Sequence, residues 1–512
     1  MRRPIFNSVV LLATMATLLP GSLRAADPEL KSIYPCGCQR GETIEVTLNG
    51  TDLKDATQLY FSCPGISAQR VGDAIFKVAV ATDVSIDICD LWVVTANGIV
   101  GPRRFAIDEL PTLVEKEENE SRDHAQAISV PSVIDAKLDR AADLDWYCFE
   151  GAQGDQVTIT CRSDSLDGTV QASMMLIGPG GDELSHSTDF QLEPQLSLRL
   201  PHSGKYALRV CDRAYRKDDY SFYRLEVKLA SGAAESSSPS DDDESIIAEV
   251  AENETMSTAQ PTQLPFRIAG NFSTRGDIDW YRFDAKKDQS FGIESSGERL
   301  GQRMDLDITV HDATGKSLLT LGDVAQPKGV PAKLTLSSLD AAGTWKAPAD
   351  GTFYLAVRDL YGGSVFGSDR KYELAARESS PSIQVIAMHP HDIATTGLSL
   401  EQGGSAELQL IAIRSSGFDG PIHVRVDQAP EGISAEAFSL SAKETSKTMK
   451  LSAADNAAAG FGFIRLVAEV VIDSQNVMID VQPRTIVRGG TPIVTRATDA
   501  TAIYVSQTTI AE

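Results

Sequence analysis

The sequence is poor in positive charge, and it lacks a second long apolar run. Lys and Arg number 47 against 71 Asp and Glu, which gives a formal net charge of −24. Such a field repels phosphate backbones and anionic lipids, so we expect no nucleic-acid partner. After residue 25 no apolar stretch approaches the roughly 20 residues of a membrane-spanning helix. We therefore expect no transmembrane helix in the mature chain.

Common catalytic signatures are also missing from the sequence. The chain has no Gly-x-Ser-x-Gly elbow, no His-Glu-x-x-His motif and no phosphate-binding Gly-x-x-x-x-Gly-Lys loop. Its seven histidines are scattered, and the one tight group, His389-Pro390-His391, is interpreted as part of a loop. These absences indicate a protein that is not an enzyme. A hydrolase whose catalytic triad assembles only on folding is the alternative.

Cysteine is confined to the first half of the chain. The seven residues lie at positions 36, 38, 63, 89, 148, 161 and 211. In an oxidising compartment the first four are expected to form two disulfides anchored by Cys36 and Cys38, with all three pairings open. One of the other three is left over and is expected to pack as a small apolar side chain. A zinc site is disfavoured because no Cys-x-x-Cys pair or nearby histidine accompanies these residues.

The first 25 residues are typical of an export signal. Arg2 and Arg3 form a basic start, and an apolar run from Val9 to Leu19 precedes a Pro-Gly break and the small residue Ala25. We expect the signal to be cleaved and the protein to be secreted, periplasmic or exposed at the cell surface. An uncleaved anchor is the alternative.

Most of the remaining chain alternates apolar and polar residues with a period of two. Thr43 to Leu48 and Leu196 to Leu200 are examples, and turn signals such as Asn49-Gly50 and Asp350-Gly351 recur between such segments. Long amphipathic helices are not found in the sequence. The patterns predict an all-β fold of tandem antiparallel β-sandwiches. At about 150 residues per domain, 512 residues predict three or four of them.

An internal repeat is the strongest pattern. Two segments recur at an offset of 134 residues, Asn119-Glu120 as Asn253-Glu254 and Asp143 to Phe149 as Asp277 to Phe283. The closing segments also match, namely Gly204 to Asp212 and Gly351 to Asp359. Two homologous domains are therefore predicted over residues 113–229 and 247–378. Residues 230–246 between them are predicted to form an acidic, Ser/Asp-rich linker.

Both copies resemble the bacterial pre-peptidase C-terminal domain, in the arrangement typical of secreted planctomycete proteins. They carry its acidic opening, its Asp-x-Asp-Trp-Tyr-x-Phe strand and its Gly-led closing strand. This resemblance implies a jelly-roll-like sandwich for each copy. Residues 26–108, with Ile33-Tyr34-Pro35, resemble an IPT/TIG immunoglobulin-like domain. Residues 381–484 resemble another Ig-like module, which leaves 485–512 as a tail or an incomplete domain.

The resemblance implies a non-catalytic function. Members of the family are appendages of secreted peptidases or parts of multi-sandwich surface proteins, and some bind calcium and polymers such as collagen. We therefore expect a calcium-stabilised protein that binds an extracellular protein or glycan, or an envelope component. Accessory modules of a secreted peptidase whose catalytic domain lies elsewhere are the alternative.

Oxygen-bearing side chains at the start of each copy are candidate Ca²⁺ ligands. Glu115, Glu117 and Asn119 are spaced two positions apart, so an extended segment projects all three side chains from one face. The resemblance adds the Asp-x-Asp pair, because collagen-binding members place calcium between the acidic opening and that strand. The candidate ligands of the first copy are Glu115, Glu117, Asn119, Glu120, Asp143 and Asp145, and those of the second are Glu249, Asn253, Glu254, Asp277 and Asp279.

The second copy is expected to bind calcium more weakly or not at all, because Ala251 replaces its middle carboxylate. For both copies the alternative is a solvated acidic segment whose side chains bond only the local backbone.

Aromatic residues near the closing strands are a candidate polymer-binding surface. They lie among basic neighbours and comprise Tyr215, Tyr220, Phe222, Tyr361 and Phe366. In contrast, the Trp-Tyr pairs at 146–147 and 280–281 lie on predicted strands, so one ring of each pair is expected in the core.

Overall fold

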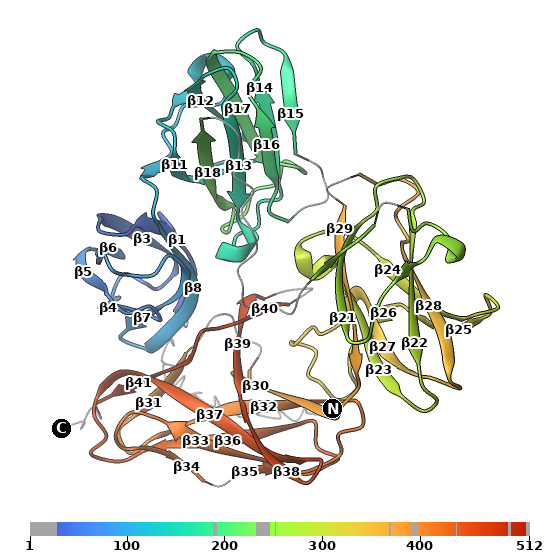
Figure 1. Ribbon diagram of the computed structural model, residues 1–512. Coiled ribbons are helices and arrows are strands. Elements are labelled where there is room, and N and C mark those ends of the chain that lie inside the picture. The colour runs from blue at the N-terminus through green and yellow to red at the C-terminus, as the bar shows by residue number, and fades with distance from the viewer. Residues whose placement is uncertain are drawn as a thin grey trace, which may run out of the picture.

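The computed structural model describes residues 28–187, 192–231, 246–250, 252–367, 370–391, 397–436, 438–489 and 493–507. These residues form eight sheets, paired face to face as four sandwiches (Figure 1). The prediction of an all-β chain of tandem sandwiches is confirmed. The expected signal peptide and nearly all of the expected linker lie outside the described residues. None of the helices described is long and apolar enough to cross a membrane.

The first sandwich has sheets of order β1-β3-β6-β5 and β2-β8-β7-β4. Its strands are β1 Glu29–Tyr34, β2 Gly37–Gln39, β3 Thr43–Thr51, β4 Gln58–Phe61, β5 Ile66–Gly72, β6 Ile75–Val80, β7 Ile88–Thr95 and β8 Gly98–Asp108. Alternate residues of β3 and β6 point inward, where Val46, Phe76 and Val78 join Phe105 in a common core.

The two repeats share one strand order, and the second adds β26 at one edge. The first has sheets β10-β12-β17-β14-β15 and β16-β13-β18-β11-β9, and the second has β20-β22-β28-β24-β25 and β19-β21-β29-β23-β27-β26. The first contains β9 Thr112–Val114, η1 Arg122–His124, β10 Gln126–Ala127, β11 Ser132–Lys137, β12 Asp145–Gly151, β13 Gln156–Arg162, η2 Asp164–Leu166, β14 Ala172–Ile177, β15 Glu183–His186, β16 Gln195–Arg199, β17 Gly204–Asp212 and β18 Phe222–Ala230.

The second repeat contains β19 Ile247–Ala248, η3 Met256–Thr258, β20 Gln260–Pro261, β21 Phe266–Asn271, β22 Ile278–Ala285, β23 Ser290–Ser296, η4 Glu298–Leu300, β24 Leu306–Asp312, β25 Ser317–Leu321, β26 Asp323–Val324, β27 Ser338–Lys346, β28 Gly351–Asp359 and β29 Lys371–Glu378. As expected, Tyr147 and Tyr281 are fully buried in the two cores, whereas Trp146 and Trp280 lie on the opposite sheet face, half-buried.

The last sandwich extends beyond residue 484, which is its predicted end. Its sheets are β34-β36-β32-β30-β39-β40 and β31-β41-β37-β33-β35, with β38 paired to β37. Its strands are β30 Ser382–Met388, β31 Leu398–Glu401, β32 Ser405–Ser415, β33 Ile422–Gln428, β34 Ile433–Ala435, β35 Phe438–Leu440, β36 Ser446–Ala453, β37 Gly460–Ile472, β38 Gln475–Asp480, β39 Gln482–Arg488, β40 Val494–Ala497 and β41 Thr501–Ser506.

The expected tail is therefore largely strand. β41 pairs parallel to β31, about a hundred residues earlier, and antiparallel to β37. Sequence periodicity shows that residues 501–506 can form a strand but does not identify partners so distant in the chain.

The disulfide prediction was wrong in number. Cys63 and Cys89 are bonded, whereas Cys36, Cys38, Cys148, Cys161 and Cys211 are free and buried. The expected anchor Cys36 instead donates its thiol to Asp135 Oδ1 across the interface with the first repeat, at 3.2 Å. In the sheet, β8 lies between β2, which carries Cys38, and β7, which carries Cys89, so these two cysteines are on strands that are not neighbours.

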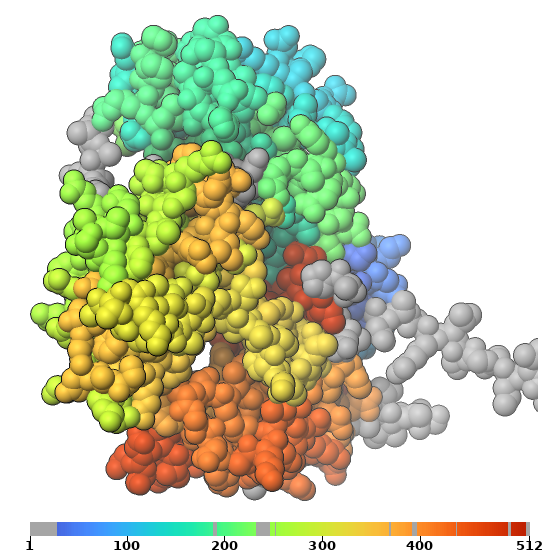
Figure 2. Space-filling view, turned by 90° about the vertical axis from the view of Figure 1, so that its right-hand side faces the viewer, coloured from blue at the N-terminus to red at the C-terminus, as the bar shows by residue number. Residues whose placement is uncertain are grey.

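An insertion in the second repeat attaches it to the last sandwich. Residues 325–337 between β26 and β27 place Leu334 in a small core with Ile386, Met388 and Ile411 of the last sandwich. Beside this core, the Lys333 ammonium donates to the carbonyls of His389 and Pro390, at 2.6 and 2.7 Å. Figure 2 shows the second repeat seated on the last sandwich.

Removal of the Leu334 side chain is expected to loosen this attachment. Leu334→Ala leaves a cavity in a fully buried site and should lower the free energy of unfolding by about 2–5 kcal/mol. Urea unfolding would measure the effect. Leu300→Ala is the matched control, because Leu300 is exposed and its loss should cost less than about 0.5 kcal/mol. Equal effects of the two substitutions would contradict the assigned packing.

Candidate metal site

The acidic opening of the first repeat is held between its two sheets. β9 runs parallel to β11, and the backbone N–H of Glu115 donates to the carbonyl of Asp135 at 2.9 Å. Four residues later the carbonyl of Asn119 accepts from the backbone N–H of Trp146, next to the start of β12, at 3.0 Å. These two bonds bring the side chains of residues 115–119 over the first residues of β12.

A tyrosine pair forms the base of the site. Glu115 Oε1 accepts from the Tyr147 hydroxyl at 2.7 Å and from Asn119 Nδ2 at 3.1 Å, and Glu115 Oε2 accepts from the Lys137 N–H at 3.0 Å. The Tyr223 hydroxyl donates to Asp145 Oδ2 at 2.5 Å and lies 2.8 Å from the Tyr147 hydroxyl. Glu115 and Asp145 are therefore fixed in position by neutral donors.

Three carboxylates converge above this base. One oxygen from each of Glu115, Glu117 and Asp145 lies within 4.8 Å of the other two. Asn119 and Asp145 are fully buried, and their Oδ1 atoms have no hydrogen-bond partner among the described residues. A buried acceptor without a donor costs about 1–3 kcal/mol. A cation among these oxygens would remove that cost and the repulsion between the carboxylates together.

The pKa values reflect the same crowding. Burial raises the pKa of Glu115 and of Asp145, and the Glu115 charge raises that of Asp145 further. Although the Glu117 side chain is largely exposed, desolvation beside the cluster, followed by the charges of Glu115 and Asp143, raises its pKa to about 7. The cluster thus takes up protons readily, as expected for acidic groups that lack a neighbouring positive charge.

Two of the predicted ligands point elsewhere. Asp143 Oδ2 accepts from the Asp139 N–H at 2.7 Å, and its Oδ1 lies 3.3 Å from the Arg140 guanidinium. Glu120 is paired with the same Arg140 at 2.8 Å. The structure therefore brings together Glu115, Glu117, Asn119 and Asp145, and pairs Asp143 and Glu120 with an arginine beside them.

The second repeat has an equivalent frame of a glutamate, an asparagine, an aspartate and a tyrosine, but the groups at its centre differ. Glu249 accepts from Asn253 Nδ2 at 3.1 Å and from the Asn271 N–H at 2.8 Å, and the Tyr372 hydroxyl donates to Asp279 at 2.7 Å. Here burial, followed by the neighbouring Glu249 carboxyl, raises the pKa of Asp279. The centre of this frame therefore holds two carboxyl groups close to each other.

The remaining predicted ligands of the second repeat do not join this pair. Asp277 accepts from the Thr274 N–H at 3.2 Å and from the Ser273 hydroxyl at 3.3 Å, and Glu254 is exposed. Ala251, at the position of the missing carboxylate, lies outside the described residues.

The tyrosine pairs are the site residues that sequence reasoning missed. Tyr147 and Tyr223 correspond to Tyr281 and Tyr372, whose hydroxyls lie 2.7 Å apart in the second repeat. The signal was present, since each tyrosine belongs to a segment that recurs between the copies. Core packing accounts for the rings, but the period-two pattern does not reveal that their hydroxyls meet beneath a carboxylate.

The structure divides the loop aromatics into two groups. Tyr215, Tyr361 and Phe366 are 54, 47 and 48% exposed, on the loops that lead into the last strand of each repeat. Phe222 is buried, and the Tyr220 ring lies under the Arg103 guanidinium at 5.2 Å. Only the first group is accessible to a partner.

Comparison with known proteins gives weak structural likenesses. No family model matches the sequence, and no curated protein matches it. The pre-peptidase C-terminal domain of a Bacillus anthracis collagenase is 16% identical over 23% of this chain and 94% of its own, with a TM-score of 0.18. SGBP-B of the Bacteroides ovatus mixed-linkage glucan utilization locus, in complex with a mixed-linkage heptasaccharide, is 10% identical over 65% of this chain and 75% of its own, with a TM-score of 0.16.

A third structure has several domains. It holds the M60 catalytic domain with the CBM51-1 and CBM51-2 domains of Clostridium perfringens ZmpB, and it is 11% identical over 92% of this chain and 39% of its own, with a TM-score of 0.14. TM-scores this low carry no functional argument, so we interpret the site from this chain's own side chains.

The melting temperature of the protein in EDTA is expected to fall as the pH rises from about 5 to about 8. The folded pKa of Glu117 is about 7, above the roughly 4.3 of an unperturbed glutamate, so the folded state holds this proton more tightly than the unfolded state. The resulting stability is complete below about pH 4 and is lost as the pH passes 7. Differential scanning fluorimetry would measure the slope.

Glu117→Gln should flatten this slope, and the adjacent exposed Glu118→Gln should leave it unchanged. A slope of the same size in Glu117→Gln and in the unmodified protein would show that other groups cause it.

Proposed function

We propose that this protein is exported and non-catalytic, that its first repeat binds one Ca²⁺, and that its surface loops bind an extracellular or envelope polymer. The observation that carries the calcium proposal is the oxygen cluster of Glu115, Glu117 and Asp145. Beside it lie two buried oxygens without a hydrogen-bond partner among the described residues, Asn119 Oδ1 and Asp145 Oδ1. Four side chains would thus offer oxygen atoms to one cation.

The donor set favours Ca²⁺ over other common cations. All donors are oxygens, whereas zinc and copper sites use imidazole or thiolate. Mg²⁺ requires nearly ideal octahedral geometry, while Ca²⁺ accepts six to eight oxygens in flexible arrangements. Glu117 is exposed, so water can complete the coordination on that side.

A bound cation would also fix the entrance to the first repeat. Glu115 directly follows β9, and Asn119 is bonded to the start of β12. Binding at these residues would hold the connection from the first sandwich against the repeat. Calcium is therefore proposed to act as a structural ion.

The hydrolase alternative lacks comparable support. The histidine–serine contacts at His124–Ser121 and His423–Ser439, 3.1 and 2.8 Å, both lie at the surface. A serine nucleophile depends on oxyanion donors in a site that excludes water. We therefore propose binding and not catalysis.

Calcium in excess is expected to raise the melting temperature relative to EDTA. At 100 times the dissociation constant, linkage gives about 2.7 kcal/mol, or on the order of 10 °C for a domain of the size of the first repeat. Glu117→Ala should abolish the difference, because it removes one ligand from the cluster. Glu118→Ala removes a neighbouring exposed carboxylate and should preserve it.

The same melting temperature in calcium and in EDTA would contradict the calcium proposal. So would a full calcium response in Glu117→Ala. Isothermal titration with Ca²⁺ gives the stoichiometry, and one ion per chain is expected, since Ala251 stands in the second repeat where the first has Glu117.

Exposed loop side chains support the polymer part of the proposal. Leu360, Tyr361 and Phe366 of the second repeat are 53, 47 and 48% exposed on one loop, and Tyr215 is exposed on the corresponding loop of the first. Aromatic side chains of this kind frequently dominate binding energy at interfaces. Their exposure on paired loops is the basis for placing the polymer contact there.

Loss of the Tyr361 and Phe366 side chains is expected to weaken polymer binding at least about tenfold. Arrays of glycans and matrix proteins would identify a ligand, and titration of Tyr361→Ala/Phe366→Ala would measure the loss. Val471→Ala/Met478→Ala is the matched control, since both side chains are exposed on the last sandwich. Equal binding by both double variants would exclude this loop.

A further inference from the structure

The last sandwich sends a hairpin toward the first two domains. We use "the arm" for residues 482–499, which contain β39 and β40 and are described except for 490–492. β40 pairs only with β39 among the described strands, at the edge of its sheet. Figure 1 shows β40 beside the junction of the first sandwich and the first repeat. The arm therefore belongs to the last sandwich and lies beside two other domains, the first sandwich and the first repeat.

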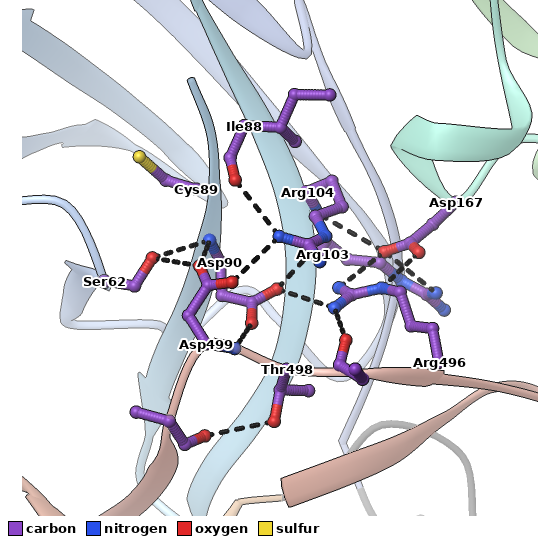
Figure 3. A network of polar contacts seen from close by, with 12 residues as sticks. Ser62, Ile88, Cys89, Asp90, Arg103, Arg104, Asp167, Arg496, Thr498 and Asp499 are labelled. Atoms are coloured by element: carbon purple, nitrogen blue, oxygen red, sulfur yellow. Dashed lines mark hydrogen bonds and ion pairs between the residues drawn. The ribbon is translucent and has the colours of Figure 1, made fainter. Parts of the chain in front are cut away.

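One arginine of the arm joins two of these domains. Arg496 lies 2.8 Å from Asp90 Oδ1 on β7 of the first sandwich, and its Nε and Nη2 donate to Asp167 of the first repeat at 2.5 and 2.9 Å. Asp90 and Asp167 are buried. Figure 3 shows the guanidinium between the two carboxylates. A single planar cation thus neutralises a carboxylate from each domain.

Asp499 adds a second set of contacts from the arm. Its N–H donates to Asp90 Oδ2 at 2.7 Å, and its carboxylate accepts from the Ser62 hydroxyl at 2.5 Å and the Arg104 guanidinium at 3.1 Å. Figure 3 shows these contacts on the side of Asp90 away from Asp167. The arm thus supplies both a cation and an anion to the first sandwich.

Arg488 completes the contact on the first repeat. Its guanidinium donates to the carbonyls of Asp167 and Gly168 at 3.1 Å each, and it lies 5.9 Å from the centre of the Tyr220 ring. Tyr220 also lies under Arg103, whose distance to Asp167 is 3.9 Å. We use "the socket" for Ser62, Asp90, Arg103, Arg104, Asp167 and Tyr220.

The socket depends on the arm for its electrostatic balance. Within the socket, Arg104 lies 3.6 Å from Asp90, and the Arg103–Asp167 contact is 3.9 Å. Both exceed the 2.5–2.9 Å contacts that Arg496 makes with the same carboxylates. Without Arg496, the two buried carboxylates would keep only these longer contacts with cations, beside the backbone N–H groups of Asp499 and Arg104, which is unfavourable in a low-dielectric interior.

An apolar contact accompanies the arm. Trp92 and Ile99 of the first sandwich pack with Ala502 of the last sandwich, with Phe461 and Tyr504 at the edge. The Tyr60 ring stacks on Phe461 with centroids 4.0 Å apart. The first and last domains thus meet over an area that is apolar beside the charged socket.

These contacts close the chain on itself. The first sandwich is joined to the first repeat by buried Arg224 on β18, which contacts Asp108 of the first sandwich at 2.6 Å and Asp135 of its own repeat at 3.4 Å. The second repeat is joined to the last sandwich through Leu334 and its neighbours. The arm supplies the charged connection between these two pairs of domains, beside the apolar contact of Trp92 and Ile99 with Ala502.

We propose that the arm is a clasp, whose partner is the socket of the same chain, and that its docking makes the four sandwiches one rigid body. The proposal does not depend on the calcium site or on polymer binding. It predicts that the relative positions of the domains are set by the socket and not by the linker between the repeats.

The test is Arg496→Ala in the full chain, studied by small-angle X-ray scattering and calorimetry. The maximum dimension is expected to increase by at least about 13 Å, the radius of gyration of one 100-residue domain, and the main thermal transition should split or move down. Arg465→Ala is the matched control, because Arg465 pairs with Asp427 and Asp480 on the exposed face of the last sandwich. It should leave both measurements unchanged.

A second, milder variant keeps the proposal testable if Arg496→Ala does not fold. Arg488→Ala with Asp499→Asn leaves Arg496 in place, removes the Arg488 bonds to the Asp167 and Gly168 carbonyls, and removes the charge that faces Arg104. A smaller change in the same direction is expected. Scattering curves and transitions identical to those of Arg465→Ala in both arm variants would overturn the proposal. A dimer of the unmodified protein whose arm docks on a second copy, detected by light scattering and lost in Arg496→Ala, would also overturn it.

Discussion

A buried carboxylate needs a positive partner, and the architecture of this protein depends on how that need is met. The first repeat gathers Glu115, Glu117 and Asp145 around a place suited to a cation. The second repeat places Glu249 beside Asp279, and burial, followed by Glu249, raises the pKa of Asp279. Between the domains, arginines supply the positive charge, with Arg224 at one interface and Arg496 at another.

The two repeats show how a small change in sequence alters this balance. Both keep the glutamate, the asparagine, the aspartate and the tyrosine pair in the same contacts. The first copy adds a third carboxylate, Glu117, and under our proposal a divalent cation offsets the resulting repulsion. The second copy has alanine at that position, so two carboxyls remain. The two copies thus share the frame and differ in the number of carboxylates that it holds.

The interdomain contacts bear on the proposed binding function. If the clasp holds the four sandwiches in one body, the exposed loops around Tyr215 and Tyr361 keep a constant spacing. Two weak contacts held at a fixed spacing bind a repetitive polymer more tightly than either contact alone, provided that the spacing fits the polymer. Calcium at the entrance of the first repeat would additionally restrict motion between the first sandwich and that repeat.

The sequence by itself determined the β-sandwich class, the duplication and the acidic openings, because period-two alternation and repeated motifs are local properties. It also indicated four side chains that the structure brings together, Glu115, Glu117, Asn119 and Asp145. It grouped Asp143 and Glu120 with them, whereas the structure pairs these two with Arg140. Only the tertiary structure decided the free cysteines, the pairing of β41, the tyrosine hydroxyls beneath the carboxylates and the arm in its socket. These features join residues tens to hundreds of positions apart, and local sequence patterns do not specify which distant groups meet when the chain folds.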